Sequence, residues 1–321
     1  MHSYIIRRIL QMIPVLFIII IMVFALIELA PGDATGNFID PRMRADDRAQ
    51  LAERFGLNEP VHVRFVRWIT AAAQGDFGRS FQYRRPVTTV IGGMVAPTLA
   101  LSSLALIISM LVGIPAGIIS ATRQYSVADN SLTVFSLLGL SMPAFFFGLI
   151  LLRVFSVWLG WFPLFGLADM TYQPANWFFW LIHRLHHLAL PAIVLGLGGT
   201  ATFMRYTRSS MLEVIKSDYI RTARAKGVKE KVVIYRHAFR NALIPVITML
   251  GFWIPSLIGG AVLTESIFQI PGMGRLAVDA VGFRDNPLII AITVMIAAIT
   301  LVSMLLADLL YAVVDPRVRY E

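Results

Sequence analysis

The chain contains six stretches of apolar residues, each long enough to cross a lipid bilayer as a helix. A helix needs about 20 mostly apolar residues to span the hydrocarbon core. Hydrophobic residues make up 57% of the 321 residues and charged residues 15%, below the roughly 25% charge that is typical of soluble domains. The sequence therefore predicts an all-α polytopic membrane protein with six transmembrane helices, over 9–29, 99–120, 132–158, 188–204, 242–263 and 288–307.

Basic residues indicate how these spans are oriented. Arg7 and Arg8 precede the first stretch, which is longer than the apolar part of a signal peptide, about 7–15 residues, and is expected to be retained. Short segments on the side of the two termini hold 15 basic residues, including all of the lysines, whereas the short loops on the other side hold three. Because such residues favour the cytoplasmic side, we expect both termini to be cytoplasmic. The spans exclude a nucleic-acid binder, although the net charge is +9.

A long polar segment separates the first two spans. Residues 31–96 are too many for a simple connection, and Val61, Phe65, Trp68 and Ile69 recur at helical spacing. We expect a small external helical insertion here. The chain then divides into an N-terminal inside end with the first span (1–30), the insertion (31–96) and a membrane core with the remaining spans (97–321).

The inside loop 205–240 differs from the rest of the chain in its charge. It holds ten basic and three acidic residues, including all four lysines of the protein. Ser217 or Asp218 can cap a short helix over 219–226, which Gly227 can end in a left-handed turn. Such a helix outside the membrane suits docking into a groove of another protein. The alternative is a solvated basic loop that sets topology or contacts anionic lipid.

The string at 218–227, DYIRTARAKG, and the string at 236–245, RHAFRNALIP, resemble the inside loop of ABC importer permeases of the dipeptide/oligopeptide/nickel family. The generic loop reads Glu-Ala-Ala, three residues, then Gly. Arg221, Thr222 and Ala223 stand at the triplet here, and Gly227 keeps the spacing. The resemblance is to the first, B-type permease, and further similar strings are LAPGD at 29–33, GDFGRS at 75–80, SMPAF at 141–145, LTESIF at 263–268, PGMGR at 271–275 and DPR at 315–317.

The resemblance implies a function in transport. A chain of this kind works in a bacterial cytoplasmic (inner) membrane with a second permease subunit, expected to be a different chain. It also works with two ATP-binding-cassette ATPase subunits and an extracytoplasmic solute-binding protein. Peptides are the favoured substrate, and nickel complexes or glutathione remain open. The expected ATPase-coupling helix consists of Asp218, Tyr219, Ile220, Arg221, Thr222, Ala223, Arg224, Ala225, Lys226 and Gly227.

The chain itself is not expected to be an enzyme. It contains no Gly-x-x-x-x-Gly-Lys-Ser/Thr string, whose backbone cradles nucleotide phosphates in many ATPases. ATP and Mg²⁺ are therefore expected to be used by the partner ATPases, with no cofactor bound by this chain. An intramembrane enzyme would need paired catalytic side chains at membrane depth, and the sequence shows none.

A few polar residues near the span ends are further candidates. Arg153, in the third span, either lines the translocation path or extends toward the interface. Glu265, at the end of the fifth span, is a candidate for shaping an outer gate. His183, His186 and His187 have the spacing of one helical face and could bind a metal, but interfacial histidines are the favoured interpretation, so no metal site is predicted.

Two further features concern the spans themselves. Gly113 and Gly117 form a Gly-x-x-x-Gly pair, which permits close helix packing. The spans carry few charges at mid-depth, whereas a self-contained secondary transporter usually places ligands and broken helices there. A secondary transporter is therefore the weaker alternative.

Overall fold

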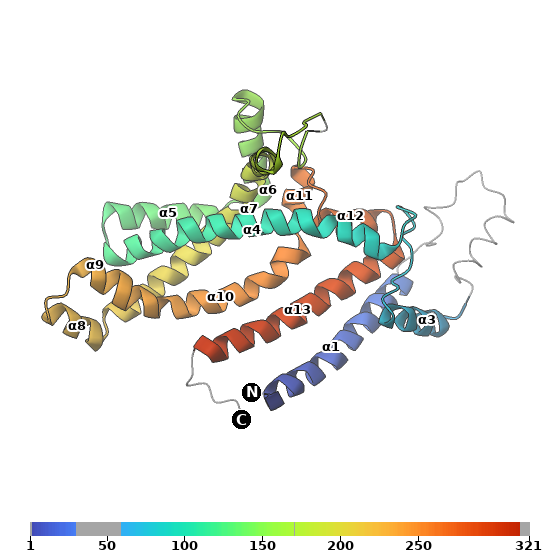
Figure 1. The fold of residues 1–321 in the computed structure, drawn as a ribbon, viewed down its shortest axis with the longest axis horizontal. Helices are drawn as coiled ribbons and strands as arrows, with labels where there is room; N and C mark the ends of the chain where they lie inside the picture. Colours follow the sequence, from blue (N-terminus) through green and yellow to red (C-terminus); the bar gives the residue numbers. More distant parts are fainter. Residues whose placement is uncertain (1, 30–58, 170, 315–321) are drawn as a thin grey trace.

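The structure, a computed structural model, describes residues 2–29, 59–169 and 171–314, and in these ranges it is helical, without strands beyond one isolated bridge between Arg79 and Pro86. The body is elongated, and most long helices follow its long axis (Figure 1). In chain order the elements are α1 (His2–Leu29), α3 (Val61–Ala73), α4 (Val87–Thr122), α5 (Val127–Ser141), α6 (Ala144–Leu151), the π-helix η1 (Leu152–Trp158), α7 (Trp177–Ile215), α8 (Asp218–Ala225), α9 (Glu230–Val232), the π-helix η2 (Val233–Ala238), α10 (Phe239–Gly259), α11 (Val262–Ile267), α12 (Met273–Gly282) and α13 (Asn286–Val314).

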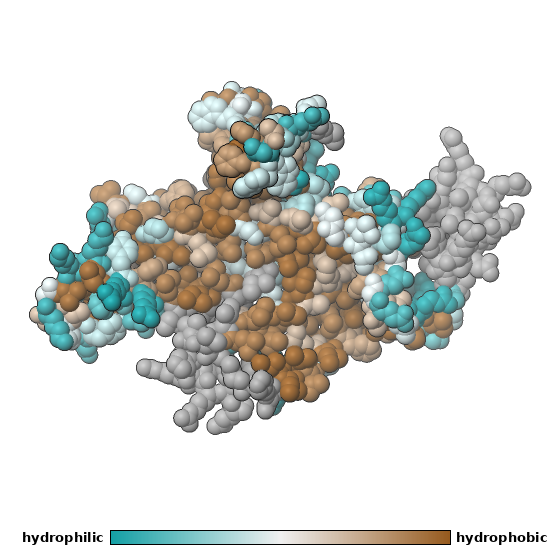
Figure 2. Space-filling view, viewed as in Figure 1, coloured by the Kyte–Doolittle hydropathy of each residue, from teal (hydrophilic) through white to brown (hydrophobic). Residues whose placement is uncertain are grey.

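The all-α membrane fold is confirmed. Within the described residues, α1, α4, α7 and α13 are long and apolar enough to cross a membrane, and a bent pair of helices brings the number of candidate spans to five. The fifth predicted stretch lies largely in α10, and the exact number of six spans stays a prediction. Apolar residues cover the middle of the body, and hydrophilic residues gather at its two ends (Figure 2).

The third predicted span is broken by a sharp bend. Its two halves, α5 with its end at Ser141 and the helix that starts at Ala144, meet at an angle of 104°. Pro143 lacks an N–H group and disfavours helical backbone in the residue before it. Met142 accordingly has extended backbone, with φ −78° and ψ 125°. The segment is therefore a broken span or a re-entrant loop.

Glycine sets the distance between α4 and α7. A Cβ atom on Gly113 would lie 2.6 Å from the carbonyl oxygen of Thr200, and one on Gly117 would lie 2.6 Å from Cβ of Thr207. The predicted close packing is thus confirmed. α7 has 39 residues and begins before the predicted stretch, because Asn176 caps its first turn by accepting hydrogen bonds from the N–H groups of Phe178 and Phe179.

The first and last helices lie side by side. Ile20 of α1 packs against Ile290 and Val294 of α13, and α3 adds side chains to the same cluster. Arg8 of α1 donates a hydrogen bond from Nε to Oδ2 of Asp308 at 3.0 Å. The predicted amphipathic helix of the insertion is therefore present as α3. The rest of the predicted insertion before residue 59 lies outside the described residues.

Candidate functional site

α8 ends in a well-formed cap, whereas at its start the predicted side-chain cap is absent, because the Ser217 hydroxyl donates to Val214 O instead. At its start Ser217 has extended backbone, and its carbonyl oxygen accepts hydrogen bonds from the N–H groups of Ile220 and Arg221. At its end the N–H of Gly227 donates to Arg224 O and the N–H of Val228 to Ala223 O. This pair of bonds is the Schellman motif, which needs a left-handed residue, and Gly227 has φ +72°. The sequence therefore located the helix to within one residue at each end.

One face of α8 is fixed to the body of the protein. Ile220 is fully buried in a cluster with Met211 of α7 and Val233 of η2, to which α4 and α10 also contribute. Tyr219 Oη accepts a hydrogen bond of 2.8 Å from Nδ2 of Asn241, on α10. α8 is therefore anchored to the ends of α7 and α10 both by apolar packing and by a hydrogen bond.

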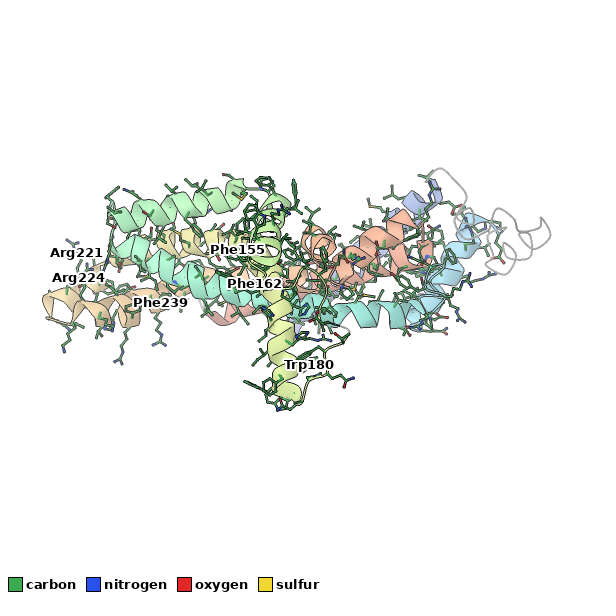
Figure 3. All side chains as sticks on the ribbon, turned by 90° about the horizontal axis from the view of Figure 1, so that it is seen from above. Phe155, Phe162, Trp180, Arg221, Arg224 and Phe239 are labelled. Carbon is green, nitrogen blue, oxygen red and sulfur yellow. The ribbon has the colours of Figure 1, made fainter. Side chains whose placement is uncertain are left out.

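The opposite face of α8 is exposed and carries charge. The side chain of Arg221 is 74% exposed and lies 3.2 Å from Asp218. Arg224 binds Glu230 of α9 through two N–H groups, at 3.1 and 2.7 Å. These hydrogen bonds lower the pKa of Glu230 and raise the pKa of the Arg224 guanidinium. Both arginines lie at one end of the molecule (Figure 3), and the exposed members of the predicted coupling helix are Asp218, Tyr219, Arg221, Thr222, Arg224, Ala225, Lys226 and Gly227.

Arg153 and Glu265 lie on other elements than α8. Arg153, on η1, is exposed, and its guanidinium lies 5.4 Å from the centre of the Trp158 ring. Glu265, on α11, is fully buried. Its carboxylate accepts hydrogen bonds from Thr98 Oγ1 at 2.8 Å and from the N–H of Arg275 at 3.0 Å. In this conformation the Glu265 carboxylate joins α4 to the α11–α12 segment rather than facing an open path.

Sequence reasoning missed a polar cluster on the same half of the molecule as α8. Asp129, near the start of α5, is 2% exposed and receives hydrogen bonds from Ser120 of α4 and Arg208 of α7. Ser120 lies only nine positions from Asp129, but Arg208 lies 79 positions away, so no local pattern reveals their pairing. In the sequence Arg208 is one of the ten basic residues of the loop 205–240, and nothing local distinguishes it from the others.

The fold and the site together define a polytopic helical membrane protein with a short, basic helix anchored at one end of its apolar body. The model of the family "Binding-protein-dependent transport system inner membrane component" matches residues 113–320, and the model of its N-terminal region matches residues 1–102. The chain therefore belongs to this family and is a permease subunit of an ABC importer. A self-contained secondary transporter is excluded by this assignment.

Curated relatives match along the whole chain. An oligopeptide transport system permease protein, AppB of Bacillus subtilis (strain 168), is 47% identical over 321 residues, which is 100% of both chains. A putative peptide permease protein of Brucella ovis is 42% identical and covers 99% of both chains. The glutathione transport system permease protein GsiC of Salmonella paratyphi A is 39% identical over 100% of both chains.

Solved structures of ABC transporters show the same fold. A chain of the inward-facing MetNI methionine ABC transporter superposes with a TM-score of 0.55 at 15% identity, over 71% of this chain and 97% of that one. A chain of an amino acid ABC transporter with histidines superposes with a TM-score of 0.52 at 16% identity, over 70% and 94%. At these identities the likeness establishes the fold alone.

Proposed function

We propose that this chain forms half of the translocation path of an importer for di- or oligopeptides. Relatives that match it end to end are named for oligopeptide, peptide and glutathione transport, and glutathione is itself a small peptide. The other half of the path is a second permease subunit of a different sequence, and an extracytoplasmic solute-binding protein delivers the peptide. A nickel complex is the alternative substrate.

We further propose that α8 couples the path to ATP hydrolysis. The observation that carries this role is the two-sided character of the helix, since Ile220 is fully buried while Arg221 on the other face is 74% exposed. A helix that is anchored on one side and exposed on the other can dock into a groove and transmit a push as a rigid body. Two ATPase subunits would supply such grooves and would bind the ATP and Mg²⁺.

The charges on α8 favour an acidic groove. The Arg221–Asp218 pair is largely exposed, and pairs of this kind contribute little to stability, about 0–1 kcal/mol. Arg221 can therefore exchange its partner for a carboxylate of an ATPase at small cost. Arg224 has a different role, because its two bonds to Glu230 hold the turn between α8 and α9 in shape.

The proposed orientation places α8 in the cytoplasm. α8 and α3 lie at opposite ends of the long axis, beyond the apolar middle of the body (Figures 1 and 2). The excess of basic residues in the α8 loop favours the cytoplasmic side for that end. The termini are then cytoplasmic and α3 is external, in a bacterial cytoplasmic membrane.

Single cysteines test both proposals, because the chain has no cysteine of its own. Thr222 on α8 and Thr70 on α3 are both exposed. In intact cells that make the whole transporter, Thr70→Cys should react with a membrane-impermeant maleimide and Thr222→Cys should not. In isolated membranes Thr222→Cys should cross-link to an ATPase subunit, and Thr70→Cys should not.

The opposite results have distinct meanings. Labelling of Thr222→Cys from outside would overturn the orientation. Failure of Thr222→Cys to cross-link with the ATPase, in a transporter that still takes up peptide, would favour the solvated basic loop. ATP-dependent uptake of a labelled oligopeptide, compared with uptake of ⁶³Ni²⁺ by the same cells, decides between the two substrates.

A further inference from the structure

Three potential metal ligands meet where the segment before α7 folds back onto the first turns of that helix. His183 and His187 are four residues apart on α7 and therefore lie on one face. Asp169, from the preceding segment, lies opposite them. Each of the three offers one ligand atom, a ring nitrogen or a carboxylate oxygen, and these atoms all lie within 4.8 Å of one another.

His187 is the unusual member of this group. Its side chain is only 1% exposed. Among the described residues neither ring nitrogen has a hydrogen-bond partner of normal geometry, although the backbone of Phe165 and Gly166 interacts with the ring. Leaving a buried polar group without a well-formed hydrogen bond is unfavourable. The nearest charged group is the Asp169 carboxylate, with Oδ1 at 3.9 Å from His187 Nε2. An imidazole held in this way can take up a further ligand.

We propose that Asp169, His183 and His187 form a binding site for a divalent transition-metal ion of the Zn²⁺ or Ni²⁺ type. Two imidazoles and one carboxylate are a donor set that suits these ions, whereas Mg²⁺ and Ca²⁺ prefer oxygen ligands alone. A fourth position stays open for water or another ligand. The site is independent of the transport assignment, since it rests only on these side chains.

The ligand atoms lie farther apart than in a loaded site but within reach of one. His183 Nε2 lies 3.8 Å from Asp169 Oδ2, His187 Nε2 lies 3.9 Å from Asp169 Oδ1, and one ligand atom from each residue lies within 4.8 Å of the others. Ligand atoms at about 2.1 Å from a tetrahedral zinc ion are about 3.4 Å apart, so the side chains must close around the ion by up to roughly 1.4 Å. His183 Nε2 now accepts a hydrogen bond from the N–H of Asp169 at 3.1 Å, which metal binding would replace.

The surroundings of His183 and His186 differ, and only His183 is oriented toward the proposed metal site. Tyr172 stacks on the His183 ring with a centroid distance of 3.9 Å and holds its orientation. His186, in contrast, has its Nε2 atom 2.8 Å from the carbonyl oxygen of Trp161. Of the three histidines considered together in the sequence, the structure therefore keeps two and adds Asp169 as the third ligand. A bound ion would fasten the segment before α7 to the helix.

Zinc binding to the purified full chain in lipid nanodiscs tests the proposal. Isothermal titration with Zn²⁺, in the presence of excess Mg²⁺, should reveal one saturable site per chain, from which Ni²⁺ competes. Asp169→Asn and His183→Ala should each weaken this binding about tenfold or more. His186→Ala is the matched control and should leave the affinity unchanged. Histidines outside α7 are the same in the unmodified chain and in all three variants, so they cannot explain a difference in affinity.

The opposite outcomes are equally clear. The absence of saturable binding, or an equal loss of affinity in His186→Ala, would overturn the site. The Asp169 side chain is 63% exposed, so Asp169→Asn should fold normally, as size-exclusion chromatography and circular dichroism can verify. If folded Asp169→Asn and His183→Ala both bind zinc like the unmodified chain, the ion is held elsewhere and the proposal is wrong.

Discussion

Arg208 of α7 donates two hydrogen bonds to Asp129 of α5, from Nε to Oδ1 and from Nη2 to Oδ2, each 3.1 Å long. Ser120 of α4 binds the same carboxylate, and the N–H of Tyr125 donates to it as well. Three helices that are separate in the sequence are therefore joined at one carboxylate. Removal of Arg208 leaves the Asp129 carboxylate buried without its cation, which makes this cluster sensitive to substitution.

Arg208→Met should destabilise the chain by about 3 kcal/mol, because it leaves the Asp129 carboxylate buried without its cation. Thermal unfolding of the purified protein in detergent measures the effect. Arg205→Met is the matched control, since Arg205 lies on the same helix but is exposed. Equal melting temperatures for the two variants would contradict a structural role of the pair.

Gly117→Ala should destabilise the packing of α4 on α7 by about 1–3 kcal/mol, as expected when a methyl group is forced into a filled space. The new Cβ would lie 2.6 Å from Cβ of Thr207. Gly92→Ala, also on α4, places its methyl group in open space and should be neutral or slightly stabilising. The melting temperatures of the two variants provide the comparison. If Gly117→Ala lowers the melting temperature no more than Gly92→Ala does, α7 tolerates the methyl group and the prediction is wrong.

Gly272→Ala should displace the Glu265 carboxylate from its hydrogen bonds with Thr98 and Arg275. A Cβ on Gly272 would lie 2.4 Å from Cδ of Glu265, a distance that requires movement. We expect a lower melting temperature and faster proteolysis between α11 and α12. Gly282→Ala, for which a Cβ meets nothing within 4 Å, serves as the control and should match the unmodified chain in both measurements.

Gly227→Val should greatly reduce peptide uptake, although a Cβ at this position has open space around it. The reason is the backbone, because φ +72° is strongly disfavoured for a β-branched residue. Gly227→Asn should retain most of the activity, since asparagine tolerates this conformation. Uptake is compared at equal amounts of transporter in the membrane, and wild-type uptake by the valine variant would remove the need for this turn.

The Arg224–Glu230 pair should respond to acid in a defined direction. Arg224 lowers the pKa of Glu230 below its ordinary value of 4.5, so the pair stabilises the α8–α9 turn above that pH and loses its effect as the pH falls through the lower, folded-state pKa. Arg224→Gln should bring the pKa of Glu230 back toward 4.5. Carboxyl ¹³C NMR of labelled protein, with Glu230→Gln to assign the signal, measures this shift.

The features that could be predicted from the sequence are those that depend on residues close together along the chain. The end of α8 followed from Gly227, and the close approach of α4 and α7 followed from two glycines. The bend at Pro143 was missed because the mean hydropathy of a stretch contains no information about the direction of the helix. The proline itself was a signal, since it disfavours continuation of the helix before it. The pairing of Asp129 with Arg208 depends on helices meeting in three dimensions, and that of Asp169 with His183 depends on how the segment before α7 folds back onto the helix. No local pattern encodes either pairing.

The contact between Arg8 and Asp308 has a consequence for biosynthesis. The two residues are 300 positions apart, so α1 leaves the ribosome long before its partner helix α13 exists. Only 6% of the apolar window of α1 is buried in the finished chain. During translation α1 therefore lies in the lipid without α13, whose Asp308 later neutralises Arg8. Folding of this subunit is complete only when its first and last helices have paired, and chains that stop before α13 should be recognised by membrane quality-control proteases.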